Sequence, residues 1–134
     1  MDEIRWKQRH ANFIKALAQL TEFVEQPKLN KFEVQGLIQC FEYTFELAWK
    51  TAKDYLEAEG FIIKSPRQTI QMAFQVQLIC DGHVWIDALE KRNLMAHTYD
   101  EAIAVQAEAL IRSKYYPMLV ALKQELDKLG KVNL

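Results

Sequence analysis

The sequence predicts an all-α protein, an up-and-down bundle of four to five helices that forms one domain over residues 1–134. Two observations support this fold class. Apolar residues recur every three or four positions through most of the chain, which is the spacing of one helix face. The four glycines and three prolines fall mostly where these apolar segments end, and the intervening connections are short. Short connections between amphipathic helices favour antiparallel neighbours around one core.

The first two expected helices have the most regular apolar spacing. One covers residues 3–25. The next should begin after Asn30, whose side chain can form a capping box with Glu33 three residues later. Glu46 and Lys50 make a favourable i,i+4 pair on this second helix. Its apolar stripe is the longest in the chain and consists of Val34, Leu37, Ile38, Phe41, Phe45, Ala48, Trp49, Ala52, Tyr55 and Leu56.

The third expected helix has a clear beginning. Gly60 suits the position just after the second helix, because glycine readily adopts the left-handed conformation found there. Ser65 is then expected to cap a new helix, with Pro66 in its first position and Gln68 completing a capping box. The helical spacing places Phe74 on the inward face of this helix.

The last third of the chain predicts two further helices. The fourth should run over residues 83–96. Thr98 followed by Glu101 has the pattern of a capping box, so a fifth helix should begin there. Pro117 lies inside the apolar pattern of that helix and should kink or interrupt it. Residues 130–134 are expected to fray.

The composition excludes several classes of protein. The 17 basic and 18 acidic residues give a net charge of −1, which argues against coating nucleic acid through bulk charge, and we expect no DNA partner. The apolar runs are shorter than the ~20 residues of a membrane span, so no membrane partner is expected. Cys40 and Cys80 lie far apart in apolar segments, which favours buried free thiols in a reducing cytoplasm.

The sequence also lacks the patterns of a metal or cofactor site. His10 and His83 have no carboxylate or cysteine at ligand spacing, so we expect no metal. The chain has no glycine loop for phosphate and no Gly-x-Ser-x-Gly nucleophile, and we expect no cofactor. Arg112, Lys114, Tyr115 and Tyr116 could stack on and neutralise a nucleic-acid strand. The plainer interpretation is a helix that packs its aromatic residues and exposes its cations.

The segment RNLMAHTYDE, residues 92–101, concentrates polar chemistry in a few residues. Arg92 and His97 are five positions apart, about 140° around an ideal helix, and would not share a face. They can meet only if the helix ends near His97 or if a second subunit supplies one of them. On spacing alone, Arg92 could simply pair with Asp87 or Glu90, and His97 could be a polar residue at a helix end.

The same segment resembles the R-x-x-x-x-H-x-Y motif of HEPN domains. The branch it resembles most is that of the small nucleotidyltransferase substrate-binding proteins, which are related to HEPN toxins of toxin–antitoxin pairs. Residues 41–51 are similar to the second helix of that family, and Ser65-Pro66-Arg67 and Trp85 also fall where its pattern has them. The resemblance spans roughly residues 10–125.

This resemblance implies a function. It implies a homodimer whose motif helices line a shared cleft, a separate minimal nucleotidyltransferase as partner, and RNA or a nucleotide as ligand. Many relatives are metal-independent ribonucleases, so the expected catalytic residues are Arg92, Asn93 and His97, with Tyr99 as the residue that the partner modifies with AMP. Weaker binding candidates are Arg67, Trp85 and Asp100. The alternative is a non-catalytic subunit that binds the substrate of a two-component nucleotidyltransferase.

Overall fold

The computed structural model of the protein describes residues 2–132, and all regular structure in this range is helical, which confirms the all-α bundle. The elements in chain order are α1 (Asp2–Glu25), α2 (Lys31–Ala58), α3 (Pro66–Gln75), α4 (Gly82–Lys91), the 3₁₀ turn η1 (Leu94–His97), α5 (Glu101–Leu110), the π turn η2 (Ile111–Tyr115) and α6 (Tyr116–Val132).

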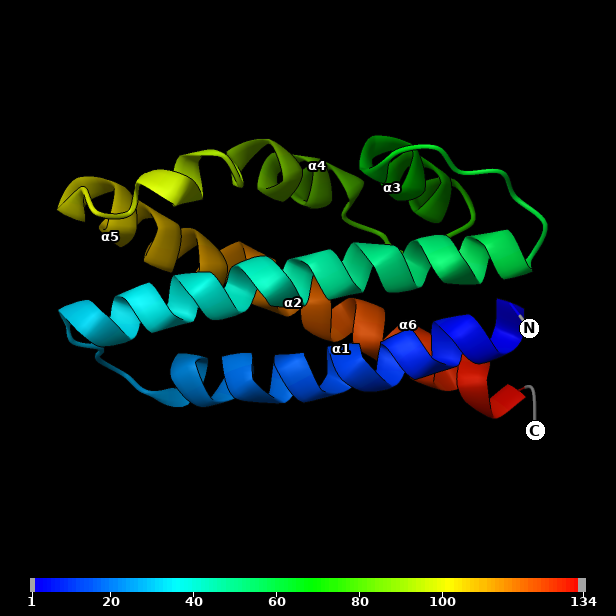
Figure 1. Ribbon diagram of the computed structural model, residues 1–134, viewed down its shortest axis with the longest axis horizontal. Helices are drawn as coiled ribbons and strands as arrows, with labels where there is room; N and C mark the ends of the chain where they lie inside the picture. The colour runs from blue at the N-terminus through cyan, green and yellow to red at the C-terminus, as the bar shows by residue number, and fades with distance from the viewer. Residues whose placement is uncertain (1, 133–134) are drawn as a thin grey trace.

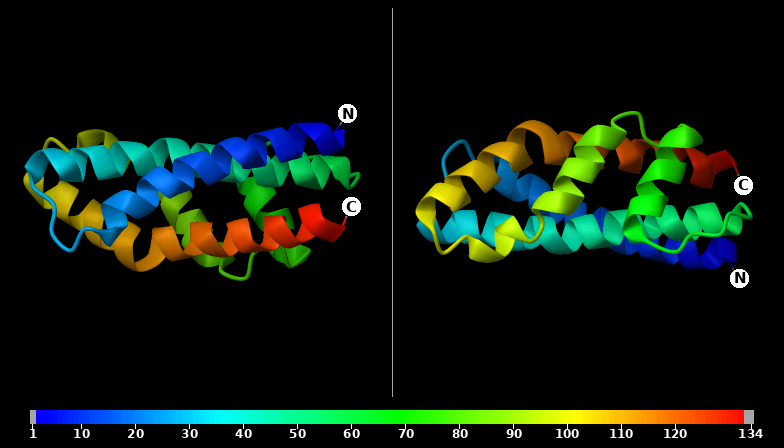
Figure 2. Two further views of the ribbon diagram at one scale, coloured as in Figure 1. Left: turned by 90° about the horizontal axis from the view of Figure 1, so that it is seen from below. Right: turned by 90° about the horizontal axis from the view of Figure 1, so that it is seen from above.

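Three long rods form the body of the bundle. Helices α1 and α2 run antiparallel along its length, and α5, η2 and α6 together form the third rod (Figure 1). The short helices α3 and α4 lie crosswise over α2 and the third rod, which differs in detail from a simple up-and-down arrangement (Figure 2). Both chain termini lie at the same end of the bundle. In the described range, the helices lack the length and apolarity needed to cross a membrane.

Two of the expected helix beginnings are confirmed. Asn30 and Glu33 form a reciprocal capping box, with both side-chain-to-backbone bonds at 2.8 Å. Ser65 caps α3 by accepting a 3.1 Å bond from the backbone N–H of Gln68. The Gln68 side chain accepts from the backbone N–H of Lys64 and not of Ser65, so the expected second bond of this box has moved by one residue. Gly60 has a φ of +100°, as its position after α2 requires.

The expected capping box of Thr98 and Glu101 is wrong. Asp100 is the N-cap of α5 and accepts a 2.9 Å bond from the backbone N–H of Ala102. The buried Thr98 hydroxyl instead donates to the side-chain amide oxygen of Gln35 on α2 at 3.0 Å. A tertiary partner therefore takes the hydroxyl, and the adjacent aspartate, a strong N-cap residue, replaces it.

The expected fourth helix is also too long, because α4 ends at Lys91 and residues 94–97 form a 3₁₀ turn. Near Pro117, the expected interruption takes the form of the π turn η2, in which the Tyr116 N–H bonds to the carbonyl of Ile111. Proline has no N–H and clashes with the carbonyl four residues before it, here that of Ser113, and a wider turn relieves both problems. Helix α6 then continues to Val132, although fraying was expected from residue 130; the rest of that expected tail, residues 133–134, lies outside the described range.

The core lies between the three rods and under α3 and α4. Its largest fully buried side chains are Trp6, Phe13, Phe41, Phe45, Trp85 and Tyr115. Two expectations about burial are wrong: Phe74 is 54% exposed, and Cys80 is an exposed thiol, whereas Cys40 is buried as expected. Cys80 lies in the α3–α4 connection and not on a packed helix face. The Phe74 ring covers Gly82 at the start of α4, where a Cβ atom would lie 3.2 Å from it.

Candidate functional site

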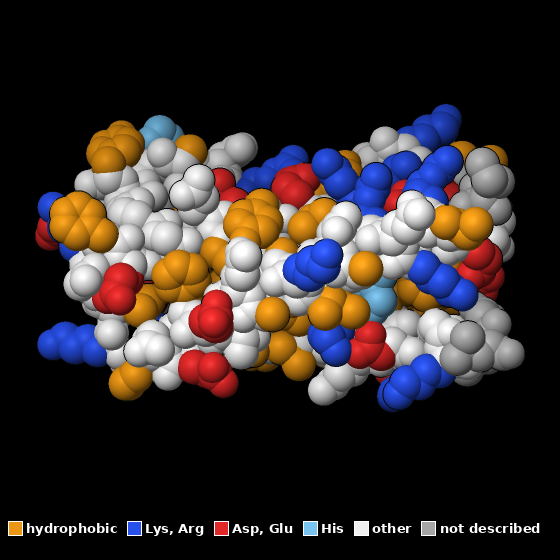
Figure 3. Space-filling model, turned by 60° about the horizontal axis from the view of Figure 1, so that its bottom comes forward, with side chains coloured by type: hydrophobic (Ala, Val, Ile, Leu, Met, Phe, Trp, Pro, Cys, Tyr) orange, Lys and Arg blue, Asp and Glu red, His pale blue; other side chains and the backbone are white. Residues whose placement is uncertain are grey.

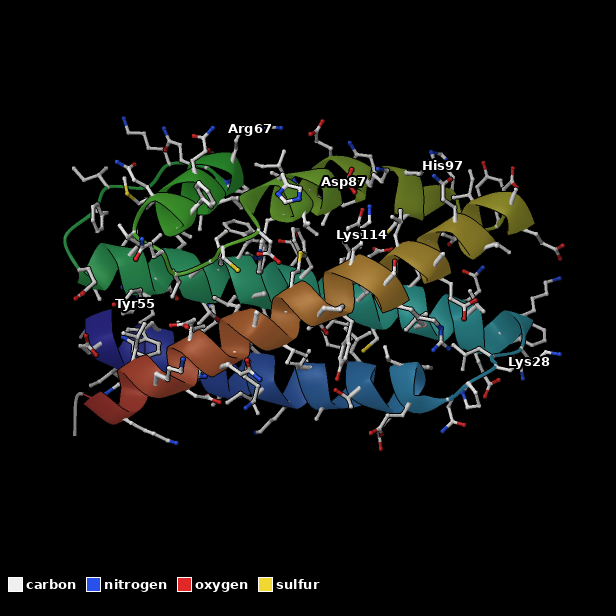
Figure 4. The ribbon with its side chains drawn as sticks, turned by 180° about the vertical axis from the view of Figure 1, so that it is seen from behind. Lys28, Tyr55, Arg67, Asp87, His97 and Lys114 are labelled. Carbon is white, nitrogen blue, oxygen red and sulfur yellow. The ribbon has the colours of Figure 1, made fainter. Side chains whose placement is uncertain are left out.

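The polar motif lies where α4 gives way to α5, on the flank of α2. Arg92 is the C-cap residue of α4, Asn93 leads into η1, and His97 is the last residue of η1. Tyr99 follows in the turn before α5 and is 81% exposed. Figure 4 shows His97 at this junction, with its side chain on the outside of the bundle. The four side chains are all accessible to a ligand.

Arg92 reaches across to α2. Among the described residues, its guanidinium pairs with the Glu46 carboxylate at 2.9 Å and not with Asp87 or Glu90, the alternative that spacing left open. Glu46 also accepts a 3.0 Å bond from the Trp49 indole. The side chains of Arg92 and Glu46 are 41% and 38% exposed, and pairs of this kind contribute about 0.2–1 kcal/mol. A phosphate that forms a bidentate bond with Arg92 can therefore displace the glutamate.

The imidazole of His97 has a defined neighbour. Its Nδ1 lies 3.2 Å from the hydroxyl oxygen of Tyr99, and the two rings meet edge to face with centroids 5.7 Å apart. Because Nδ1 is engaged by the phenol, Nε2 is the nitrogen left for proton exchange with a ligand. A histidine can exchange a proton near neutral pH in either direction, as general base or general acid.

A hollow of about 510 Å³ opens beside Arg92 and Asn93 on the α2 side. Phe41 and Phe45 of α2 border it, although both side chains are almost fully buried in the core. Its rim carries Glu42, Tyr43 and Glu46. Burial raises the pKa of the Glu42 carboxyl above its usual value, because loss of water disfavours the charged form.

The three weaker binding candidates do not join this site. Arg67 is exposed on α3, and Figure 4 shows it well away from His97. Trp85 is 2% exposed and packs against Phe45 with ring centroids 5.7 Å apart, so it is a core residue. Asp100 has a structural task as the N-cap of α5. None of the three lines the hollow beside Arg92.

Two residues at the site were missed by the sequence analysis. Glu46 was interpreted only through its local pair with Lys50, which is present at 3.9 Å, and its contact with Arg92 spans 46 positions of sequence. Gln35 holds the turn beneath the motif by bonding both the hydroxyl and the carbonyl of Thr98. Periodicity carries no signal for such distant pairs. Residues 2–132 contain no group of three metal-ligating side chains.

The fold and the Arg–His motif at a helix junction define a HEPN-type protein. The chain matches the family described as "Nucleotidyltransferase substrate binding protein like" over residues 8–128 and belongs to this family. It is 32% identical over 87 residues to "Probable ribonuclease HepT" of Haemophilus influenzae (strain ATCC 51907 / DSM 11121 / KW20 / Rd). That alignment covers 56% of this chain and 56% of the relative, which is less than two thirds of its length.

A solved structure supports the fold independently. A crystal structure of a protein from Thermus thermophilus is similar to this chain with a TM-score of 0.72 and 34% sequence identity. The similarity covers 91% of this chain and 99% of that protein.

Proposed function

We propose that the protein is a HEPN-type subunit that partners a separate minimal nucleotidyltransferase and is itself a metal-independent endoribonuclease. The observation that carries this proposal is the exposed His97 with its Nδ1 held by Tyr99, close in sequence to an arginine whose present partner is displaceable. The family name supports the nucleotidyltransferase partner. The name of the Haemophilus influenzae relative supports the ribonuclease activity.

The proposed reaction needs only side chains of this protein. In it, the ribose 2′-oxygen attacks the adjacent phosphorus, and the bond from phosphorus to the 5′-oxygen breaks. Nε2 of neutral His97 takes the 2′-hydroxyl proton, and the imidazolium that forms returns this proton to the leaving 5′-oxygen. Arg92 leaves Glu46 and offsets the negative charge that gathers on the phosphate. The proposal gives the Asn93 amide, which lines the hollow beside Arg92, the role of orienting His97 or a phosphate oxygen.

The proposed control acts through Tyr99. The partner would transfer AMP from ATP to the phenol oxygen, so that an oxygen–phosphorus bond forms and pyrophosphate leaves. The exposed phenol is accessible to an enzyme of that kind, and its hydroxyl is the group that contacts His97. Modification would remove the phenolic proton from that contact. It would also place a negative charge and a nucleotide beside Arg92, where RNA must bind.

The proposed assembly is a homodimer with the motif near the two-fold axis. Exposed apolar side chains lie on the elements around the motif, namely Phe32 and Tyr43 on α2, Tyr99, and Val105 on α5. Figure 3 shows apolar side chains across much of one face, mixed with Asp and Glu toward the end away from the termini, while most Lys and Arg lie toward the other end. Isologous contacts place the same patch on both subunits, so two motifs would share one cleft.

The second candidate function is a non-catalytic subunit that binds the substrate of the nucleotidyltransferase. The hollow beside Arg92 favours it, because the exposed ring of Tyr43 and a guanidinium at one hollow together suit a nucleotide. Under this alternative, Glu46 keeps Arg92 ordered until the ligand arrives, and His97 has no role in bond cleavage.

Expression of the chain alone discriminates the two functions. The ribonuclease should arrest growth and produce RNA ends with 2′,3′-cyclic phosphate, and His97→Ala should abolish both effects. Copurification with the nucleotidyltransferase encoded beside it, followed by mass spectrometry of Tyr99, tests the control. Unchanged growth and intact RNA would support the binding subunit and reject the nuclease.

A further inference from the structure

A second hollow of about 510 Å³ lies on the other side of α4, between this helix and η2. We call it the α4–η2 groove. Its charged lining residues are Asp87 and Lys91 of α4 and Lys114 of η2. Figure 4 shows Asp87 and Lys114 close together on the face of the molecule that also carries His97. The function proposed above assigns no role to this groove.

The carboxylate of the groove is already satisfied. Asp87 accepts a 2.5 Å bond from the ammonium of Lys91 and a 2.5 Å bond from the buried hydroxyl of Tyr115. These two bonds lower the pKa of Asp87, and the charge of Lys114 acts in the same direction. Lys114 is exposed and makes no salt bridge with the described residues. Two ammonium groups and one carboxylate leave the groove with an excess of one positive charge.

The π turn η2 explains why Lys114 lies here. Pro117 prevents a regular helical bond at Ser113, and the chain widens into a turn with one additional residue. The widened turn buries Tyr115 against Asp87 and leaves its neighbour Lys114 on the groove. The π turn that bonds to α4 through Tyr115 therefore also carries Lys114 at the groove.

The groove also has a fixed relation to Arg92. Lys91 and Arg92 are consecutive, and consecutive residues at a helix end point about 100° apart. Accordingly, Arg92 turns to Glu46 on the α2 side, whereas Lys91 turns to Asp87 on the η2 side. An extended polyanion that crosses the end of α4 would contact the guanidinium on one flank and the ammonium groups on the other.

We propose that the α4–η2 groove is a second phosphate subsite for single-stranded RNA, in which Lys91 and Lys114 hold a backbone phosphate near the one at Arg92. This inference rests on the proposed function and extends it to the path of the substrate. Lysines bind phosphate as point charges and read no sequence, so the groove fixes the position of the strand and not its base preference. The carboxylate of Asp87 holds the Lys91 ammonium in place, but its negative charge lowers the affinity of the groove for anions.

The test measures RNA binding separately from cleavage. In a His97→Ala background, the dissociation constant for a short single-stranded RNA is measured by fluorescence anisotropy over a range of salt concentrations. Each phosphate contact to a single strand contributes about 0.7 to the slope of log K against log salt concentration. Lys114→Ala should lower the slope by about that amount, and Lys114→Arg should restore it. Lys15→Ala, which removes an exposed cation from α1, is the matched control and should leave the slope unchanged.

A second variant, at Asp87, should change RNA binding in the opposite direction. Asp87→Asn can still accept the Tyr115 hydrogen bond but removes the carboxylate charge, so RNA should bind more tightly and with a steeper salt dependence. A parallel titration with ATP distinguishes a strand from a free nucleotide. Dependence on Lys114 for ATP but not for RNA would overturn the strand subsite.

The outcomes separate this inference from the ribonuclease proposal. If the intact chain cleaves RNA but Lys114→Ala and Lys15→Ala have equal salt slopes, the phosphate subsite in the groove is overturned and the ribonuclease proposal stands. Lys114-dependent binding without any cleavage supports the groove and rejects the nuclease. If the His97→Ala chain does not bind RNA, the proposed phosphate subsite is overturned as well. Circular dichroism and thermal melting of each variant confirm that the comparisons are made between folded proteins.

Discussion

The hydrogen bond from Tyr115 to Asp87 links the π turn to α4, the helix that Arg92 follows as C-cap residue, and Tyr115→Phe tests its contribution. Tyr115 is fully buried, and its hydroxyl lies 2.5 Å from a carboxylate oxygen. The substitution removes one oxygen atom and keeps the ring, which stacks on Phe41 with centroids 5.3 Å apart. The packing of the core should therefore be unchanged, and the effect should report the hydrogen bond.

The expected loss of stability follows from the nature of the bond. A hydrogen bond to a charged group contributes about 1.5–3 kcal/mol, against ~1 kcal/mol for a neutral pair. The Asp87 side chain is 37% exposed and keeps its bond to Lys91, so water can replace part of what is lost. We therefore expect a decrease in the free energy of unfolding near the lower end, about 1.5 kcal/mol at pH 7. Urea denaturation followed by circular dichroism measures it.

The pH dependence gives this prediction a second test. The bonds to Lys91 and Tyr115 depress the pKa of Asp87 in the folded state. A depressed carboxyl pKa contributes stability that is present above the unfolded pKa of ~3.9 and is lost as the pH falls through the folded pKa. The difference between the wild type and Tyr115→Phe should thus be constant at neutral pH. It should narrow below about pH 4, where Asp87 begins to be protonated in the unfolded state.

Tyr116→Phe provides a matched control. The Tyr116 hydroxyl lies 2.7 Å from the hydroxyl of Thr21, so this bond joins two neutral groups. Its removal should cost roughly 1 kcal/mol and should not depend on pH between about 3 and 8. If Tyr115→Phe matched this control in both magnitude and pH profile, the charge-assisted bond to Asp87 would not stabilise the fold as argued.

Three substitutions test the separate roles of the motif residues in RNA cleavage and in its control. His97→Ala should lower RNA cleavage by roughly 10²–10⁴ with an unchanged melting temperature, because the exposed imidazole contributes little packing. Arg92→Lys should also impair cleavage severely, since an ammonium lacks the planar fork that binds phosphate at two points. Tyr99→Phe should lower cleavage by at most about tenfold, the worth of one hydrogen bond, while abolishing silencing by the nucleotidyltransferase. If Tyr99→Phe were as inactive as His97→Ala, the phenol would be catalytic.

Several features that depend only on neighbours in sequence were predicted correctly. Asn30, Ser65 and Gly60 act within one helical turn of themselves, and the periodic apolar stripe of α2 is a local signal of the same kind. Thr98 had an equally good local pattern, but Gln35, 63 positions away, takes its hydroxyl. A local rule fails where a tertiary partner competes for the same atom. Phe74 shows the corresponding failure for burial, because helical spacing defines a face but not what covers it.

The position of the motif along the chain could be taken from the sequence, but the contacts of its side chains could not. The motif is contiguous in sequence, so the resemblance could place Arg92, Asn93, His97 and Tyr99 together. The interruption of the helix before His97, required for Arg92 and His97 to share a site in one chain, is present as the turn η1. The partners of the two residues differ, however: Arg92 pairs with Glu46, and His97 contacts Tyr99. Neither partner could be derived from spacing on one helix.

This difference in partners leads to a prediction about the proposed dimer. If each site combines Arg92 of one copy with His97 of the other, a heterodimer of Arg92→Ala and His97→Ala chains contains one intact site and one doubly damaged site. If each site uses both residues of one chain, both sites of the heterodimer are damaged.

Mixing the two inactive variants in equal amounts, after unfolding and refolding together, distinguishes these arrangements. Half of the dimers should be heterodimers with one intact site of two, so a composite site restores about one quarter of the wild-type cleavage rate. Refolded wild type provides the reference rate, and each variant refolded alone provides the background. A mixture that stays at the background while size-exclusion chromatography shows heterodimers would place Arg92 and His97 of the same chain in one site. Arg92 would then have to leave Glu46 and turn toward its own His97 when RNA binds.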